Sequence, residues 1–284
     1  MSATDAAGEA AGQPSEETRE TVAASTTSAT PPAPGSAHTL GAPAPAAATP
    51  GGQTPRSVVV AIDGPSGSGK SSVSRAVARR LGLAYLDTGA MYRALTWWCL
   101  EQGIDLDDEP AVTAAASDFP LVMGTDPTDP HVRVGDADVT AEIRTTRISS
   151  AVSAVARHLP TRAILIALQR DWVDRCSVQG IVAEGRDITS VVAPDADVRL
   201  LLTASEQARL ARRARELHGD SGESALAATR DEVLRRDRDD SAVTSFLEPT
   251  DGVRLLDTSD LDFDSTVDAV VRAVEAARAE RAGR

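Results

Sequence analysis

The chain has 284 residues, a net charge of −13 and 42% hydrophobic residues, yet no apolar run reaches the about 18 residues that a membrane-spanning helix needs. An acidic chain is a poor general binder of nucleic acid. The two cysteines, Cys99 and Cys176, form no Cys-x-x-Cys pair, which disfavours a disulfide framework or a cysteine zinc site. We expect a cytoplasmic monomer with no nucleic-acid or membrane partner.

The first 55 residues differ in composition from the rest of the chain. They hold eight of the sixteen prolines and no aromatic residue, and Val22 and Leu40 are their only large aliphatic residues beyond Met1. Such a segment cannot bury enough apolar area to offset its ordering entropy. It starts with acidic residues and lacks an apolar stretch, so we do not interpret it as a signal peptide. We predict a disordered tail over residues 1–55 and one folded domain over residues 56–284.

A predicted strand, a glycine loop and a predicted helix follow the tail. Residues 57–62 form a β-branched run that is typical of a strand buried on both faces. Residues 64–71 match the phosphate-loop pattern G-x-x-x-x-G-K-[ST], and apolar residues at helical spacing predict a helix over 70–81. The candidate nucleotide-binding residues are Gly64, Pro65, Ser66, Gly67, Ser68, Gly69, Lys70, Ser71 and Ser72.

Lys70 is the only lysine in the chain, and the other 28 of the 29 basic residues are arginines. In a phosphate loop, backbone N–H groups and the helix N-terminus surround a phosphate, and the lysine ammonium adds a compact positive charge. The Ser71 hydroxyl is a candidate ligand for Mg²⁺. A glycine turn that binds nothing is the alternative, but the flanking strand and helix favour a nucleoside triphosphate site. We expect ATP and Mg²⁺ there.

The phosphate loop alone does not identify the reaction. A GTPase needs an N-K-x-D motif, and this chain has no second lysine to supply one. It also lacks the L-S-G-G-Q signature of transporter ATPases and any basic, aromatic stretch expected of a helicase channel. These exclusions leave the small-molecule kinases. Their acceptor sites are built from arginines, which this chain has in abundance.

The segment after the next predicted strand, residues 83–86, supplies candidate acceptor residues. Asp87 or Thr88 is expected to cap a helix, and Arg93 lies about one turn inside that helix. A hydroxyl and a guanidinium at this spacing fit a clamp for an acceptor phosphate. A plain helix cap followed by a surface arginine would give the same pattern.

A third predicted strand, residues 181–183, ends in a charged segment. In parallel α/β sheets ligands bind at the carboxyl ends of strands, so the residues that follow are candidates for function. We expect Glu184 to support Mg²⁺ through water, Arg186 to hold a phosphate, and Asp187 to accept hydrogen bonds from a base or sugar.

Residues 235–240 (Arg-Arg-Asp-Arg-Asp-Asp) form the most densely charged segment and follow a predicted helix over 223–234. By itself such a run is typical of a solvated helix end. A lid is the alternative, since an arginine that closes over the transferring phosphoryl group stabilises its charge and excludes water.

Taken in order, these segments resemble the bacterial cytidylate kinases, a family of nucleoside monophosphate kinases. The resemblance rests on residues 61–72, 86–93, 139–145 (Val-Thr-Ala-Glu-Ile-Arg-Thr), 184–188 and 235–241. It implies an α/β fold with a parallel phosphate-loop sheet flanked by helices. It also implies a small β-rich insertion for the nucleoside monophosphate at about 119–145, where Asp-Pro turns separate two short predicted strands, and a helical lid at about 220–246.

The resemblance further implies transfer of the γ-phosphoryl group of ATP to CMP or dCMP. The residues it makes catalytic are Lys70, Arg186 and Arg236. Those it assigns to the acceptor are Arg162 and Asp187 for the cytosine edge, Thr88, Arg93 and Arg186 for the phosphate and sugar, and Asp240 for the ribose.

Two positions depart from the family pattern. Val243 stands where the family often has a lid arginine, and Ala154 stands where a substrate-contacting serine is common, with Ser153 beside it. We consider Arg235 or Arg238 as replacements for the missing lid arginine.

Two other functions fit parts of this sequence. One is a kinase for a different small acceptor, either another nucleoside monophosphate or a metabolite alcohol. The other is a nucleotide-binding switch without an acceptor, which the candidate acceptor residues disfavour.

Overall fold

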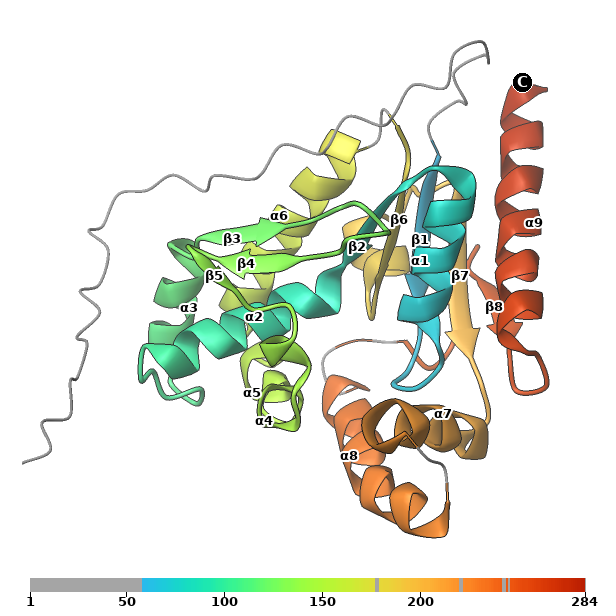
Figure 1. Ribbon diagram of the computed structural model, residues 1–284. Helices are drawn as coiled ribbons and strands as arrows, with labels where there is room; N and C mark the ends of the chain where they lie inside the picture. Colours follow the sequence, from blue (N-terminus) through green and yellow to red (C-terminus); the bar gives the residue numbers. More distant parts are fainter. Residues whose placement is uncertain (1–57, 177–178, 220–221, 242–243, 245, 284) are drawn as a thin grey trace, which may run out of the picture. The chain divides into compact units, whose positions relative to one another are not determined.

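The computed structural model describes residues 58–176, 179–219, 222–241, 244 and 246–283, so the predicted tail lies outside the described residues. A parallel sheet forms the centre of the described part (Figure 1). Its strands lie in the order β2 (Ala84–Asp87), β6 (Ile181–Gly185), β1 (Val59–Asp63), β7 (Val198–Thr203) and β8 (Arg254–Asp257). Val60 of the central strand pairs with both Val182 and Val198.

Alternate residues of these strands pack into two apolar layers, one on each face of the sheet. Val60 and Ile62 pack with helices α1 (Lys70–Leu81) and α9 (Phe263–Ala282), which lie side by side. Ala61 and Ala183 face the opposite layer, which contains helices α2 (Thr88–Glu101) and α6 (Leu159–Cys176). Strands that are buried on both faces read as continuous apolar runs, as the sequence predicted.

A smaller antiparallel sheet packs beside α2. Its strands are β3 (Leu121–Met123), β4 (Val132–Val134) and β5 (Ala137–Asp138), and they lie within the range expected for the insertion. The chain enters this sheet from α3 (Glu109–Ser117). It leaves through the short 3₁₀ helix η1 (Glu142–Arg144) and the short helices α4 (Thr146–Ser149) and α5 (Val152–Ala156). Val132 and Val134 join the apolar layer of α2.

Two further helices pack against each other below the carboxyl ends of the strands in Figure 1, α7 (Glu206–His218) and α8 (Glu223–Ser241). The charged segment 235–240 therefore lies in the last turns of a helix. Its side chains are not all solvated, because Asp237 and Asp240 are buried.

Most of the expected elements are confirmed, including the helix over 70–81, which is α1 with the same bounds. Strands β5 and β7, helices α3 and α7 and the short π-helix η2 (Ile188–Val192) had not been predicted. Within the described ranges no single helix is long and apolar enough to cross a membrane. One pair of consecutive helical segments, Thr146–Ala156 and Leu159–Cys176, has the length and composition of a membrane span when taken together, but the two are bent by 106° relative to each other.

Candidate active site

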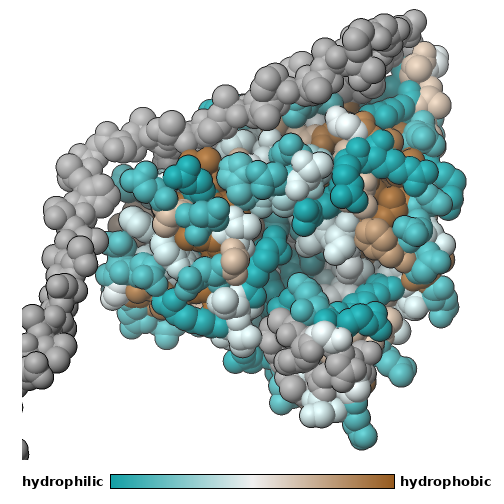
Figure 2. Space-filling model, viewed as in Figure 1, coloured by the Kyte–Doolittle hydropathy of each residue, from teal (hydrophilic) through white to brown (hydrophobic). Residues whose placement is uncertain are grey.

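A cavity of about 940 Å³ opens at the carboxyl ends of β1, β2 and β6. Lys70 and Arg93, which belong to different candidate sites in the sequence, both line it. The face shown in Figure 2 is largely hydrophilic and is hollowed near its centre. The cavity also contains Ser66–Ser72, Thr88, Arg162, Glu184, Arg186, Asp187, Arg236 and Asp240, whereas Gly64 and Pro65 lie outside its lining.

The phosphate loop adopts a conformation that leaves backbone donors available. Gly67 and Gly69 have φ angles of 74° and 87°, a region that side chains with a Cβ rarely adopt. No side chain caps helix α1, so its first N–H groups face the cavity without an internal partner. These groups and the positive end of the helix dipole favour an anion at this point.

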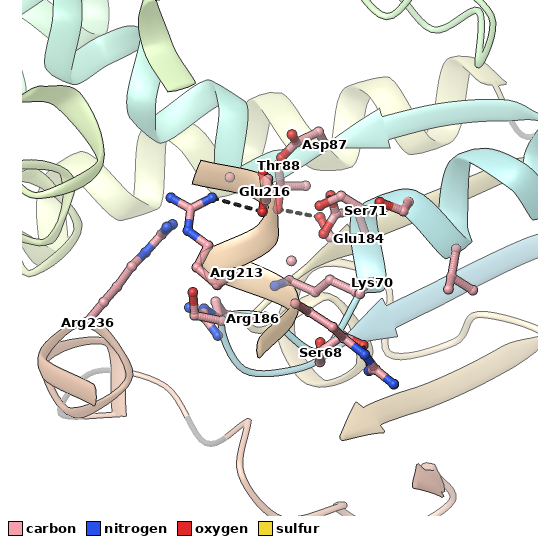
Figure 3. A pocket seen from close by; sticks show the side chains of 18 of the residues that line it. Ser68, Lys70, Ser71, Asp87, Thr88, Glu184, Arg186, Arg213, Glu216 and Arg236 are labelled. Atoms are coloured by element: carbon pink, nitrogen blue, oxygen red, sulfur yellow. Dashed lines mark hydrogen bonds and ion pairs between the residues drawn. The ribbon is translucent and has the colours of Figure 1, made fainter. Parts of the chain in front are cut away.

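Lys70 reaches into the cavity beside Arg186 (Figure 3). Its Nζ donates to the carbonyl oxygen of Pro65 at 3.3 Å. Burial, assisted by the positive charge of Arg186, lowers the pKa of Lys70 to about 8. The ammonium is therefore mostly charged at neutral pH, but it lies in an environment where a bound anion would stabilise that charge strongly.

The Ser71 hydroxyl, in the first turn of α1, pairs with the Glu184 carboxylate near the end of β6. Ser71 donates to Oε1 of Glu184 at 2.6 Å, and the Tyr85 hydroxyl donates to the same oxygen at 3.1 Å. Burial, followed by repulsion from Asp87, raises the pKa of Glu184. Oxygen ligands of this kind suit Mg²⁺, which binds through one or two carboxylates together with water and phosphate oxygens.

Asp87 organises the start of α2. It caps the helix by accepting from the Ala90 N–H at 2.8 Å, and it pairs with Nη2 of Arg93 at 2.9 Å and Nη2 of Arg144 at 3.3 Å. Burial alone would raise the pKa of Asp87, but these two guanidinium groups lower it overall. The neighbouring Thr88 hydroxyl donates to the carbonyl oxygen of Glu184 at 2.8 Å, which ties α2 to β6.

Arg162 and Asp187 form a buried ion pair that also lines the cavity. Nη2 of Arg162 lies 2.5 Å from Oδ2 of Asp187. Burial raises the pKa of Asp187, while the charge of Arg162 opposes that rise. The buried Asp63 holds the residues that follow Asp187 in place, because it accepts from the N–H groups of Ile188 and Thr189 at 2.9 and 2.8 Å.

Arg186 connects the phosphate loop to helix α8. Nη1 donates to the carbonyl oxygen of Gly64 at 2.8 Å, and Nη2 pairs with Oδ2 of Asp240 at 2.9 Å. The guanidinium carbon lies 4.3 Å from the centre of the Phe246 ring, which is cation–π geometry. Asp240 also accepts from the Ser153 hydroxyl at 3.3 Å.

Arg236 lies on the same helix and points toward the cavity (Figure 3). Burial, together with repulsion from Arg186, lowers the pKa of Arg236 to about 10. Five guanidinium groups that the sequence analysis did not select also line the cavity: Arg75, Arg144, Arg212, Arg213 and Arg215. The signal for the last three was the spacing of arginines after Ser205, which caps α7.

The suggestion that Arg235 or Arg238 replaces the missing lid arginine is not supported. Both residues are exposed on α8 and neither lines the cavity, because they lie on the opposite side of the helix from Arg236. Helix α7 instead supplies Arg212, Arg213 and Arg215 to the cavity. Val243, where the family often has that arginine, lies outside the described residues.

The fold and the cavity together define the class: a small-molecule kinase in which a phosphate loop faces a set of arginines at the edge of a parallel sheet. The family model for cytidylate kinase matches residues 60–276. This chain belongs to the cytidylate kinase family, as the motifs predicted.

Individual relatives agree with the family model. A cytidylate kinase from Streptomyces avermitilis is 47% identical over 230 residues, which cover 81% of this chain and 97% of the relative. One from Cutibacterium acnes is 49% identical over 218 residues, which cover 75% and 94% of the two chains. Among solved structures, a gluconokinase from Sinorhizobium meliloti 1021 matches with a TM-score of 0.38 and 19% identity, covering 81% of this chain and 95% of that chain.

Proposed function

We propose that this protein transfers the γ-phosphoryl group of ATP to the 5′-phosphate of CMP or dCMP, giving CDP or dCDP and ADP. The observation that carries the proposal is that the phosphate loop and the arginines at Arg93, Arg162 and Arg186 open into one cavity. The relatives named cytidylate kinase support the same acceptor. A cytoplasmic monomer without nucleic-acid or membrane partners remains part of the proposal.

The reaction needs alignment and charge neutralisation more than a base. The nucleophile is a phosphate oxygen of the acceptor, which is already largely anionic at neutral pH. We assign Lys70, Arg186 and Arg236 to the charge that develops around the transferring group. The backbone N–H groups of Gly67–Ser72 bind the donor phosphates. Thr88 and Arg93 bind the acceptor phosphate and sugar, and Asp240 binds the ribose.

Ser71 and Glu184 are the residues that would hold Mg²⁺, Ser71 directly and Glu184 through water. When bound, the ion would neutralise part of the charge on the donor phosphates. The 2.6 Å hydrogen bond between the two side chains keeps both oxygens at the cavity wall.

Asp187 and Arg162 are assigned to the base. Cytosine carries an amine donor at the position where uracil carries an acceptor, and a carboxylate accepts hydrogen bonds only. Asp187 therefore favours cytosine, and a buried carboxylate that faces uracil loses a charged hydrogen bond. The ion pair with Arg162 opposes the rise in the pKa of Asp187 that burial causes.

A coupled assay of ADP formation tests this proposal. The full chain, ATP and Mg²⁺ are combined in parallel with CMP, dCMP, UMP, AMP, shikimate and gluconate. We expect rapid ADP formation with CMP and dCMP and much slower formation with the others. A greater rate with an alcohol acceptor would favour a metabolite kinase, and ATP binding without any acceptor-dependent ADP would favour a nucleotide-binding switch.

A further inference from the structure

A closed set of contacts joins the phosphate loop to helices α7 and α8 at Ser66. The N–H of Ser66 donates to Oδ1 of Asp237 at 2.9 Å, and the carbonyl oxygen of Ser66 accepts from Nη1 of Arg209 at 2.9 Å. Arg209 and Asp237 also pair directly with each other. The backbone donor and acceptor of one loop residue are thus both held by an ion pair that comes from two helices.

This Ser66–Arg209–Asp237 cluster is shielded from water. The side chains of Arg209 and Asp237 are 11% and 9% exposed. The loop and α7 also touch through their backbones, since a Cβ on Gly67 would lie 2.5 Å from the carbonyl oxygen of Arg209. Hydrogen bonds in such a place are stronger than on the surface, and the close contact leaves the loop little room to move.

The cluster also balances charge beside the phosphate loop. An unpaired carboxylate at Asp237 would repel a bound triphosphate. Arg209 cancels that charge, and Nη2 of Arg186 lies 3.4 Å from Oδ1 of the same carboxylate. Arg209 therefore both holds the Ser66 carbonyl and neutralises its partner.

Neither Arg209 nor Asp237 lines the cavity, unlike Lys70 and Arg236. Their contacts reach a ligand only through the loop backbone. We propose that Arg209 and Asp237 are positioning residues that fix the conformation of the phosphate loop through Ser66 and thereby set its affinity for the donor triphosphate. This inference rests on the proposed function for the identity of the donor.

Equilibrium titration of each full-length variant with ATP and Mg²⁺, without acceptor, tests the proposal. Arg209→Met should weaken ATP binding about tenfold, because two charge-assisted hydrogen bonds are lost. Its affinity for CMP in a separate titration should change less than about twofold. The double variant Arg209→Met/Asp237→Asn should bind ATP no more weakly than Arg209→Met, since both residues act through one peptide.

Asp239→Asn is the matched control, because Asp239 lies on the same helix but is exposed and does not line the cavity. It should bind ATP like the unaltered protein. Thermal unfolding confirms that each variant is folded, and if Arg209→Met does not fold, Asp237→Asn alone should still weaken ATP binding about threefold or more.

Folded Arg209→Met or Asp237→Asn protein that binds ATP within twofold of the unaltered protein would overturn the proposal. So would a double variant whose loss equals the product of the two single losses, or an equal loss for ATP and CMP in Arg209→Met. Failure of the proposed function is distinguishable, because it would appear as a missing CMP-dependent reaction in the unaltered protein and leave these ATP titrations interpretable.

Discussion

Lys70 is the only lysine in the chain, and its charge depends on pH near neutrality. Burial and Arg186 lower its pKa to about 8, so the ammonium loses its proton as pH rises through that value. Because only the charged form attracts a triphosphate, kcat/KM for ATP should be constant below about pH 7.5. Above pH 8 it should fall about tenfold for each pH unit, since this parameter reports the free enzyme.

The pH profile of Lys70→Arg supplies the comparison. A guanidinium stays charged throughout the range, so kcat/KM for ATP of the variant should not fall above pH 8. Its overall rate should be lower, because a planar group fits the loop less well. If kcat/KM for ATP in the unaltered protein stayed constant to about pH 9.5, the assignment of Lys70 would be wrong.

Asp187 provides the second test at the scale of a residue. Asp187→Ala removes the acceptor that distinguishes cytosine from uracil, so the ratio of kcat/KM for CMP to that for UMP should fall at least about tenfold. KM for ATP should change much less, because Asp187 is not part of the phosphate loop. Steady-state kinetics with both acceptors measure this, and an equal loss for CMP and UMP would count against the base-reading role.

At the scale of elements, the end of β6 fixes the distance between the two sides of the acceptor site. A Cβ on Gly185 would lie 2.3 Å from Oγ1 of Thr88 and 2.9 Å from Cδ1 of Ile188. Gly185→Ala should therefore push α2 away from η2, raise KM for CMP at least about tenfold and cost about 1–3 kcal/mol of stability.

Thermal unfolding and CMP kinetics measure the two effects of Gly185→Ala. For a domain of this size the midpoint should fall by about 2–4 °C for each kcal/mol. Gly283→Ala is the control, because its nearest neighbours would lie at 3.7 and 3.8 Å, which is ordinary contact. A Gly185→Ala variant with unchanged KM for CMP would show that this junction does not position the acceptor residues.

The elements also show how far sequence reasoning reaches. The phosphate loop, α1 and the Asp87 cap follow from local patterns of residues, so they could be predicted. Helix α7 was missed although Ser205 caps it, because its arginines look like a solvated charged face until the fold packs them against the loop. Asp63 contacts Ile188 and Thr189, which lie 125 and 126 positions further along the chain. These contacts depend on the order of the strands in the sheet, which no local sequence pattern contains.

At the scale of the whole molecule, the composition of the sequence predicts a tail over residues 1–55 and a catalytic domain over residues 56–284. The family model begins at residue 60, so the match does not include residues 1–55. Deleting residues 1–55 should leave kcat and both KM values within about twofold of those of the full chain. A large drop in steady-state turnover would show that the tail contributes to catalysis.

The central claim is that one cavity brings a donor phosphate and a pyrimidine nucleotide together for direct transfer. Product analysis of the full chain with ATP, Mg²⁺ and CMP, by ion-exchange chromatography and phosphate determination, tests it most directly. We predict one CDP for each ADP, no free orthophosphate, and no ADP when CMP is omitted. ADP accompanied by equal orthophosphate and no CDP would contradict the account.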